Sequence, residues 1–149
     1  MPYEEAGAAL RKAAQDLEGR ELVGVIQSLG VRQDQQAVDL LKKRLAGDDV
    51  KAAAAAAVAL GQIATSPALE ALEAALHDPR PEVRNAAAEG LIVGAEHQLV
   101  AENQQRAQQY FDAVRSANVP NTRIAEATRG AILARQADGL TLLLEQFKQ

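Results

Sequence analysis

The chain has 149 residues, which is the length of one domain and enough to bury a substantial core. Its apolar fraction of 48% argues against disorder, and its net charge of −4 argues against a nucleic-acid binder, which normally carries a basic face. There is no cysteine, which excludes disulfides and thiolate metal sites. No apolar run reaches the roughly 18 residues of a membrane span, and the acidic, amphipathic N-terminus does not read as a signal peptide. We therefore expect a folded domain with no nucleic-acid or membrane partner.

The N-terminal part of the chain predicts a lead-in helix followed by a first helical hairpin. The lead-in helix is expected over Tyr3–Leu17, where small and apolar residues recur at helical spacing. The first helix of the hairpin is expected over Arg20–Leu29 and ends at Gly30, because glycine tolerates the left-handed conformation at a helix end. Its partner helix opens at Gln33 or Asp34.

The stretch from Asp48 to Val83 is the clearest hairpin of the chain. The carboxylate of Asp48 or Asp49 is expected to cap an alanine-dominated helix, since alanine has the best helix propensity. That helix is predicted to end at Gly61. A second helix follows, with Ser66 as its cap, a proline at its first position and leucines at i, i+3 and i+7.

Two further hairpins complete the chain. The third is longer, with a first helix that starts at Val83 and continues to about Ala101 and a partner over Asn103–Ala117. The fourth is expected over Ile124–Ala134 and Leu140–Phe147. Both are predicted from apolar residues at helical spacing between polar turns.

The hairpins recur with a regular period. Equivalent positions start the units near Gly19, Val50, Val83 and Ile124, spaced 31, 33 and 41 residues apart. A period in the thirties that is built from helix pairs indicates a stacked solenoid, because one hairpin cannot bury its apolar faces alone. The sequence therefore predicts one domain over residues 1–149: an all-α, right-handed α-solenoid of about four hairpins plus the lead-in helix.

Two segments carry a family resemblance, VKAAAAAAVALGQI at 50–63 and ALEALEAALHDPRPEVRNAAAEGL at 68–91. They resemble the HEAT repeat in its short bacterial form, which is also found in phycobilisome lyases. In that family the first helix typically reads V-R-x-x-A-A-x-A-L-G, and the second carries spaced leucines and ends in aspartate. The resemblance implies a ladder that pairs Asp78 with Arg84 and, more loosely, Asp48 with Lys51. In the last unit Arg135 replaces the glycine, which suggests a divergent terminal repeat.

The resemblance implies a non-enzymatic protein-interaction or scaffolding module, which can be one segment of a larger bacterial protein. Bilin lyases of similar fold leave open an alternative, an accessory or catalytic subunit of a lyase-type modification enzyme. HEAT-like iron hydroxylases need several His-Glu pairs, which the isolated His77 and His97 cannot supply. No serine has the context of a nucleophile, and we expect no cofactor.

The resemblance also implies that the second helices of the hairpins line a concave surface. Outward positions on these helices form the predicted partner-binding ridge: Asp39, Lys42, Lys43, Glu70, Glu73, His77, Gln108, Asp112 and Arg115. The charge along this ridge changes from basic to acidic to mixed, which suits a protein or peptide of complementary charge. The alternative is a solvated face that keeps the chain soluble. We expect a monomer or a weak dimer, and no compartment is predicted.

Overall fold

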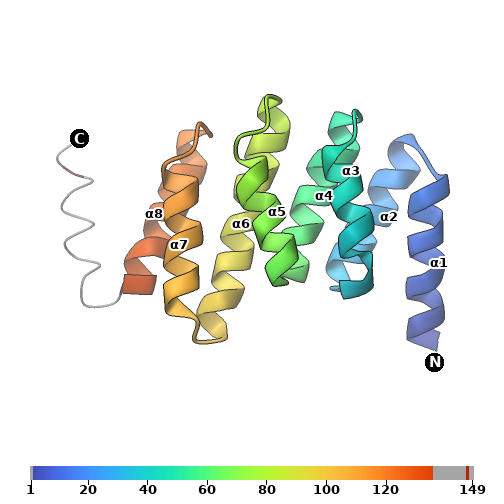
Figure 1. The fold of residues 1–149 in the computed structure, drawn as a ribbon, viewed down its shortest axis with the longest axis horizontal. Helices are drawn as coiled ribbons and strands as arrows, with labels where there is room; N and C mark the ends of the chain where they lie inside the picture. The colour runs from blue at the N-terminus through green and yellow to red at the C-terminus, as the bar shows by residue number, and fades with distance from the viewer. Residues whose placement is uncertain (1, 136–146, 148–149) are drawn as a thin grey trace.

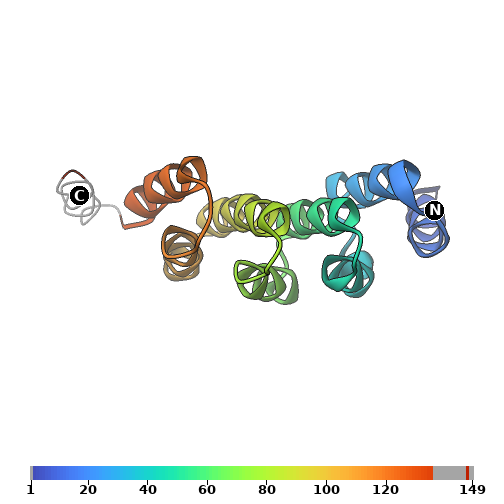
Figure 2. The same ribbon diagram turned by 90° about the horizontal axis from the view of Figure 1, so that it is seen from above.

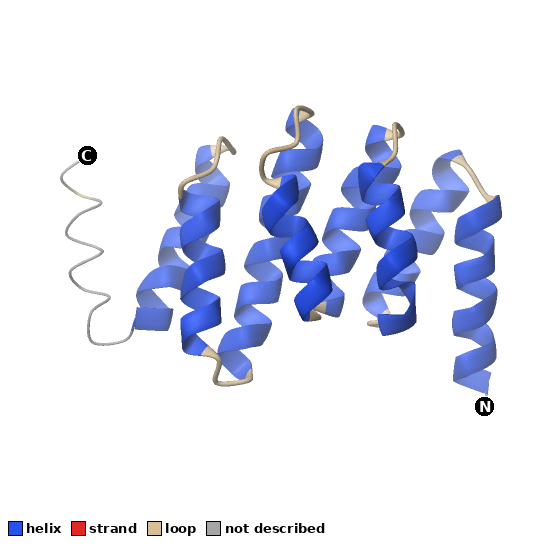
Figure 3. Ribbon diagram, viewed as in Figure 1, coloured by secondary structure: helices blue, strands red, loops and turns tan. Residues whose placement is uncertain are grey.

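The computed structural model describes residues 2–135 and 147, and this part of the chain is helical, with no strand (Figures 1 and 3). In chain order the elements are α1 (Pro2–Asp16), α2 (Gly19–Val31), the 3-10 helix η1 (Gln35–Ala37), α3 (Val38–Ala46), α4 (Val50–Ile63), α5 (Ser66–Ala75), α6 (Pro81–Val100), α7 (Gln104–Arg115) and α8 (Asn121–Arg135). The prediction of an all-α repeat solenoid is confirmed.

The helices pair into consecutive hairpins that stand side by side (Figure 1). The lead-in helix α1 is followed by the hairpins α2–α3, α4–α5 and α6–α7, and α8 opens a fourth unit. The second helix of that unit, predicted over Leu140–Phe147, lies outside the described residues apart from Phe147. Leucines of the second helices point inward, and Leu41, Leu69 and Leu72 are fully buried against the first helices.

The first helices pack on one another through very small residues. A Cβ atom added to Gly61 would lie 2.2 Å from the carbonyl oxygen of Gly90, so α4 and α6 touch backbone to backbone. The prediction that Gly61 ends its helix is therefore wrong: α4 continues to Ile63, and Ala64 adopts the left-handed conformation with φ 57°. Gly30 likewise lies inside α2, where an added Cβ would meet the backbone of the next first helix at 2.7 Å.

These close contacts set the curvature of the array. Figure 2 shows α2, α4, α6 and α8 along the inner, concave side and α3, α5 and α7 along the outer side. Alanine and glycine let the first helices approach closely, whereas neighbouring second helices contact one another much less. The expectation that the second helices line the concave surface is therefore wrong for this chain.

Arginine side chains tie the turns of neighbouring units together. Arg44 of α3 donates to the carbonyl of Ala14 at 2.7 Å, at the end of α1. One unit further on, Arg80 donates to the carbonyls of Leu45 and Gly47 at 3.1 and 2.5 Å, at the end of α3. The last carbonyls of a helix have no partner within the helix, so each arginine satisfies groups that would otherwise need water.

The predicted ladder has different partners from those expected. The carboxylate of Asp78 accepts from the side chain of Arg80 at 2.8 Å. Arg84 donates to backbone carbonyls instead, including that of Asp78 at 2.9 Å. No hydrogen bond or ion pair joins the side chains of Asp48 and Lys51 in the part of the chain that the structure describes. Arg80, rather than Arg84, binds the Asp78 carboxylate because Arg80 lies in the same turn, two residues after the aspartate. Arg84 follows the aspartate by six residues and lies in α6.

The two predicted caps of the central hairpin have opposite outcomes. Of the two candidate carboxylates, Asp49 caps α4, accepting from two amides of its first turn at 3.0 and 3.1 Å. Ser66 does not cap α5, because it is already the first helical residue and Thr65 occupies the cap position without a side-chain bond. The Ser66 hydroxyl instead accepts from Arg106 of α7 at 2.6 Å, and so links two outer helices.

Candidate partner-binding groove

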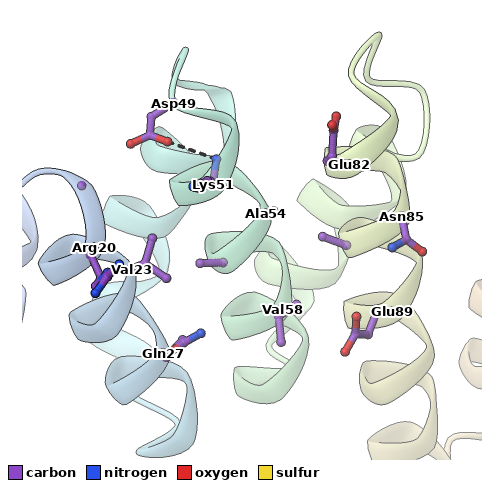
Figure 4. A pocket seen from close by; sticks show the side chains of 13 residues that line it. Arg20, Val23, Gln27, Asp49, Lys51, Ala54, Val58, Glu82, Asn85 and Glu89 are labelled. Atoms are coloured by element: carbon purple, nitrogen blue, oxygen red, sulfur yellow. Dashed lines mark hydrogen bonds between the residues drawn. The ribbon is translucent and has the colours of Figure 1, made fainter.

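An open groove of about 740 Å³ lies on the concave face and is lined by α2, α4 and α6 (Figure 4). We call it the concave groove and define it by the residues that line it: Gly19, Arg20, Val23, Gln27, Asp49, Lys51, Ala54, Ala55, Val58, Glu82, Asn85, Ala86 and Glu89. In Figure 4 the Ala54 and Val58 side chains project from α4 into the space between α2 and α6.

The floor of the concave groove comes from α4. Lys51, Ala54, Ala55 and Val58 follow one another at i, i+3, i+4 and i+7, so they form one stripe along the helix. Ala54, Ala55 and Val58 are half-buried, because the opposite face of α4 supplies the core and leaves this stripe toward solvent. Apart from Lys51 at one end, the floor is therefore apolar and consists of small side chains.

The wall formed by α2 is basic at one end and polar at the other. Arg20, Val23 and Gln27 are spaced three and four residues apart and line this side (Figure 4). Arg20 and Gln27 are exposed, and Val23 is half-buried. Arg20 of this wall and Lys51 at the same end of the floor are the cations of the groove, and the Asp49 carboxylate that caps α4 lies beside them in the lining.

The wall formed by α6 is acidic. Glu82, Asn85 and Glu89 line it at spacings of three and four residues. Arg123 of α8 braces it from outside, donating to Asn85 Oδ1 at 3.0 Å and to the Glu89 carboxylate at 2.8 Å. Glu82 is exposed and has no hydrogen bond or ion pair to any described residue, so its charge faces solvent. The groove thus has walls of opposite charge on either side of an apolar floor.

The predicted ridge residues of α3 and α5 lie on the outer side of the array. Asp39 and Lys43 are exposed on α3. Lys42 and His77 line a small hollow of about 360 Å³ between α3 and α5. Glu70 of α5 is exposed on the same outer row.

Glu70 and Glu73 of α5 act electrostatically on Tyr110 of α7. Burial raises the pKa of the Tyr110 phenol, Arg106 lowers it, and the two glutamates raise it further. Tyr110 is buried with 3% of its surface exposed, and it fills part of the space between the outer helices.

The ridge residues of α7 turn away from α5 and toward α8. Gln108 donates to the carbonyl of Ala134 at 3.0 Å. Asp112 pairs with Arg115 at 2.9 Å and also with Arg135 of α8. These three residues therefore belong to the α7–α8 contact, and the structure does not bring the predicted ridge together as one surface. Whether the α3 and α5 part of it binds a partner stays a prediction.

Sequence reasoning missed the concave groove. One signal was available, because the first helices are the alanine-rich ones, and small residues allow the closest approach and hence the inner side of a curve. The α4 residues that line the groove also form a recognisable pattern in the sequence, since Lys51 is followed by Ala54, Ala55 and Val58 at helical spacing. Without the direction of curvature, these residues resemble any exposed helix face.

Two further features concern the described residues 2–135 and 147, namely metal-binding clusters and membrane-spanning helices. No group of three or more histidine, aspartate or glutamate side chains suited to a metal ion occurs in this part of the chain. None of the described helices combines the length and apolarity needed to cross a membrane.

The residues that line the concave groove all lie in a part of the chain that matches a known repeat family. A family model described as HEAT repeats matches residues 3–92, which is 90 of the 149 residues. The match includes α2, α4 and all of the α6 residues that line the groove. No curated protein matches the chain.

Proposed function

Because this chain belongs to the HEAT-repeat family, we propose that it is a non-enzymatic protein-interaction module that holds a protein partner in the concave groove. HEAT repeats generally mediate protein–protein interaction or scaffolding. We choose this surface because the apolar floor formed by α4 lies between walls of opposite charge. Apolar contact between charged margins is the usual composition of a protein interface, which has a desolvated centre and a polar rim.

Affinity capture from cell lysate, followed by mass spectrometry, tests this proposal. The bait is the full chain, and the blocking variant is Ala54→Trp, which places a large side chain on the groove floor. The matched control is Ala125→Trp, the same substitution at an exposed position of α8 outside the groove. We expect the wild type and the control to retain the same partner and the blocking variant to lose it by at least about tenfold.

Other results would redirect the proposal. If Ala54→Trp retains the partner while Lys42→Glu combined with Lys43→Glu loses it, the outer surface of α3 is the binding site. Tight binding of a bilin chromophore by the purified chain would instead support the lyase-type alternative.

A further inference from the structure

Building on the proposed function, we infer that the occupant of the concave groove is an amphipathic α-helix of a partner protein. Its central stripe carries large apolar side chains. One edge, which faces Arg20 and Lys51, carries carboxylates, and the other edge, which faces Glu82 and Glu89, carries lysine or arginine.

A helix suits the groove better than an extended peptide because of backbone hydrogen bonding. Beyond the first turn of each helix, the backbone groups of α2, α4 and α6 along the groove are used within their own helices. The only amide side chains of the lining are Gln27 and Asn85, and Asn85 Oδ1 already accepts from Arg123. An extended peptide would therefore leave many of its backbone donors and acceptors without partners, which is costly on burial. A helical partner satisfies its own backbone before it binds.

The size of the floor residues indicates what the partner presents. Ala54 and Ala55 offer little side-chain volume and remain half-buried, so the floor provides holes rather than protruding side chains. Dense packing is reached when large residues on one surface meet small residues on the other. A stripe of leucine, isoleucine or phenylalanine at i, i+3, i+4 and i+7 is the complementary pattern for a helix in a groove.

Charge complementarity indicates which charged residues lie along the two edges of the partner helix. Arg20 and the side chain of Lys51 make no hydrogen bond or ion pair with a described residue, so both cations are available to carboxylates. Across the floor, Glu82 is equally available, while Glu89 shares its charge with Arg123. Opposite charges at the margin of an interface steer association and suppress partners of the wrong pattern.

The groove also sets the length of the contact. From Arg20 to Gln27 the α2 wall rises seven residues, or about 10 Å at 1.5 Å per residue. The α6 wall from Glu82 to Glu89 has the same length. A partner helix of two to three turns therefore covers the groove.

Fluorescence anisotropy with three labelled 18-residue peptides tests this inference. The mixed-edge peptide has a leucine stripe with glutamates along one edge and lysines along the other. The proline peptide is the same sequence with two central prolines on its outer face, and the basic-edge peptide has lysines on both edges. Each is titrated with the wild type, with Arg20→Glu combined with Lys51→Glu, and with Lys12→Glu combined with Arg129→Glu, two exposed residues outside the groove and the predicted ridge.

The third protein is the matched control, because both double variants change the formal net charge from −4 to about −8, but only the first alters the groove. Glutamate is also favourable in the first turns of α2 and α4, so the groove variant is expected to remain folded. Circular dichroism of each variant checks this.

We expect the wild type to bind the mixed-edge peptide at least about tenfold tighter than the proline peptide. The groove variant should lose most of that affinity and prefer the basic-edge peptide, while the control variant behaves as the wild type. The inference fails if the proline peptide binds equally well, if both double variants have the same effect, or if no peptide binds. If no peptide binds but Ala54→Trp still abolishes capture of the natural partner, the helix inference fails and the proposed function stands.

Discussion

Asp78 and Arg80 pair within the turn between α5 and α6, and Arg80 joins this turn to the end of α3. The Asp78 carboxylate accepts from the Arg80 backbone amide at 2.9 Å and from its guanidinium at 2.8 Å. Arg80 in turn reaches the carbonyls at the end of α3. Hydrogen bonds from Arg80 hold the pKa of Asp78 below its usual value, although partial burial acts in the opposite direction. One ion pair thus fixes the geometry between two units.

We expect Asp78→Asn to lower the free energy of unfolding at pH 7. Because the folded-state pKa of Asp78 is depressed, its contribution is present above the unfolded-state pKa of about 3.8 and is lost as the pH falls through the folded-state value. The difference between variant and wild type should therefore shrink on acidification below about pH 4. Urea unfolding between pH 7 and pH 2.5 measures it. The exposed Asp16→Asn at the end of α1 serves as control, and a difference that stays constant with pH would contradict the ion-pair role.

At the scale of the elements, the contact between α4 and α6 determines how closely the first helices stack. Gly61 and Gly90 face one another, and an added Cβ at either position would lie within 2.5 Å of a backbone oxygen across the contact. The obstacle is main chain, which cannot move aside as a flexible side chain can. Any side chain at Gly61 would therefore push the two helices apart.

Gly61→Ala should destabilise the protein by about 1–3 kcal/mol, even though alanine is a better helix former than glycine. The matched control is Gly24→Ala in α2, where an added Cβ meets nothing within 4 Å. The free energy of unfolding of that variant should rise by about 0.5–1 kcal/mol, because alanine has a higher helix propensity than glycine. Thermal and urea unfolding compare the two. Stabilisation by both substitutions would show that α4 and α6 are not held at contact distance.

Considered as a whole, the molecule is a row in which each unit contacts only its neighbours. The lead-in helix α1 packs on α2 and α3, and α8 packs on α6 and α7. Stability in such arrays is close to a sum of unit and interface contributions, so damage at one end need not spread to the other. The groove spans three units and depends on their relative placement.

Ile26→Ala tests this organisation, because Ile26 of α2 is completely buried. The substitution should lower the free energy of unfolding of the units around α2 by about 2–5 kcal/mol. Hydrogen–deuterium exchange should become faster in α1, α2 and α3, while protection in α7 and α8 changes little. Equal loss of protection along the whole chain would mean that the array unfolds as a single cooperative unit.

Local signals were enough to predict the helices and their order. The alanine run of α4, the Asp49 cap and the proline-containing turn before α6 act over a few residues, so their effect can be read without knowing the fold. The period of the hairpins likewise predicts a solenoid, because each hairpin needs neighbours to bury its apolar faces.

The curvature, and with it the candidate site, was decided only by tertiary structure. The direction of bending depends on the summed sizes of side chains between neighbouring helices, which no single segment contains. The same is true of Gly61, whose role as a contact point depends on Gly90 in another helix. The sequence by itself therefore determined a helical repeat array, whereas packing between repeats decided that α2, α4 and α6, and not the outer helices, form the groove.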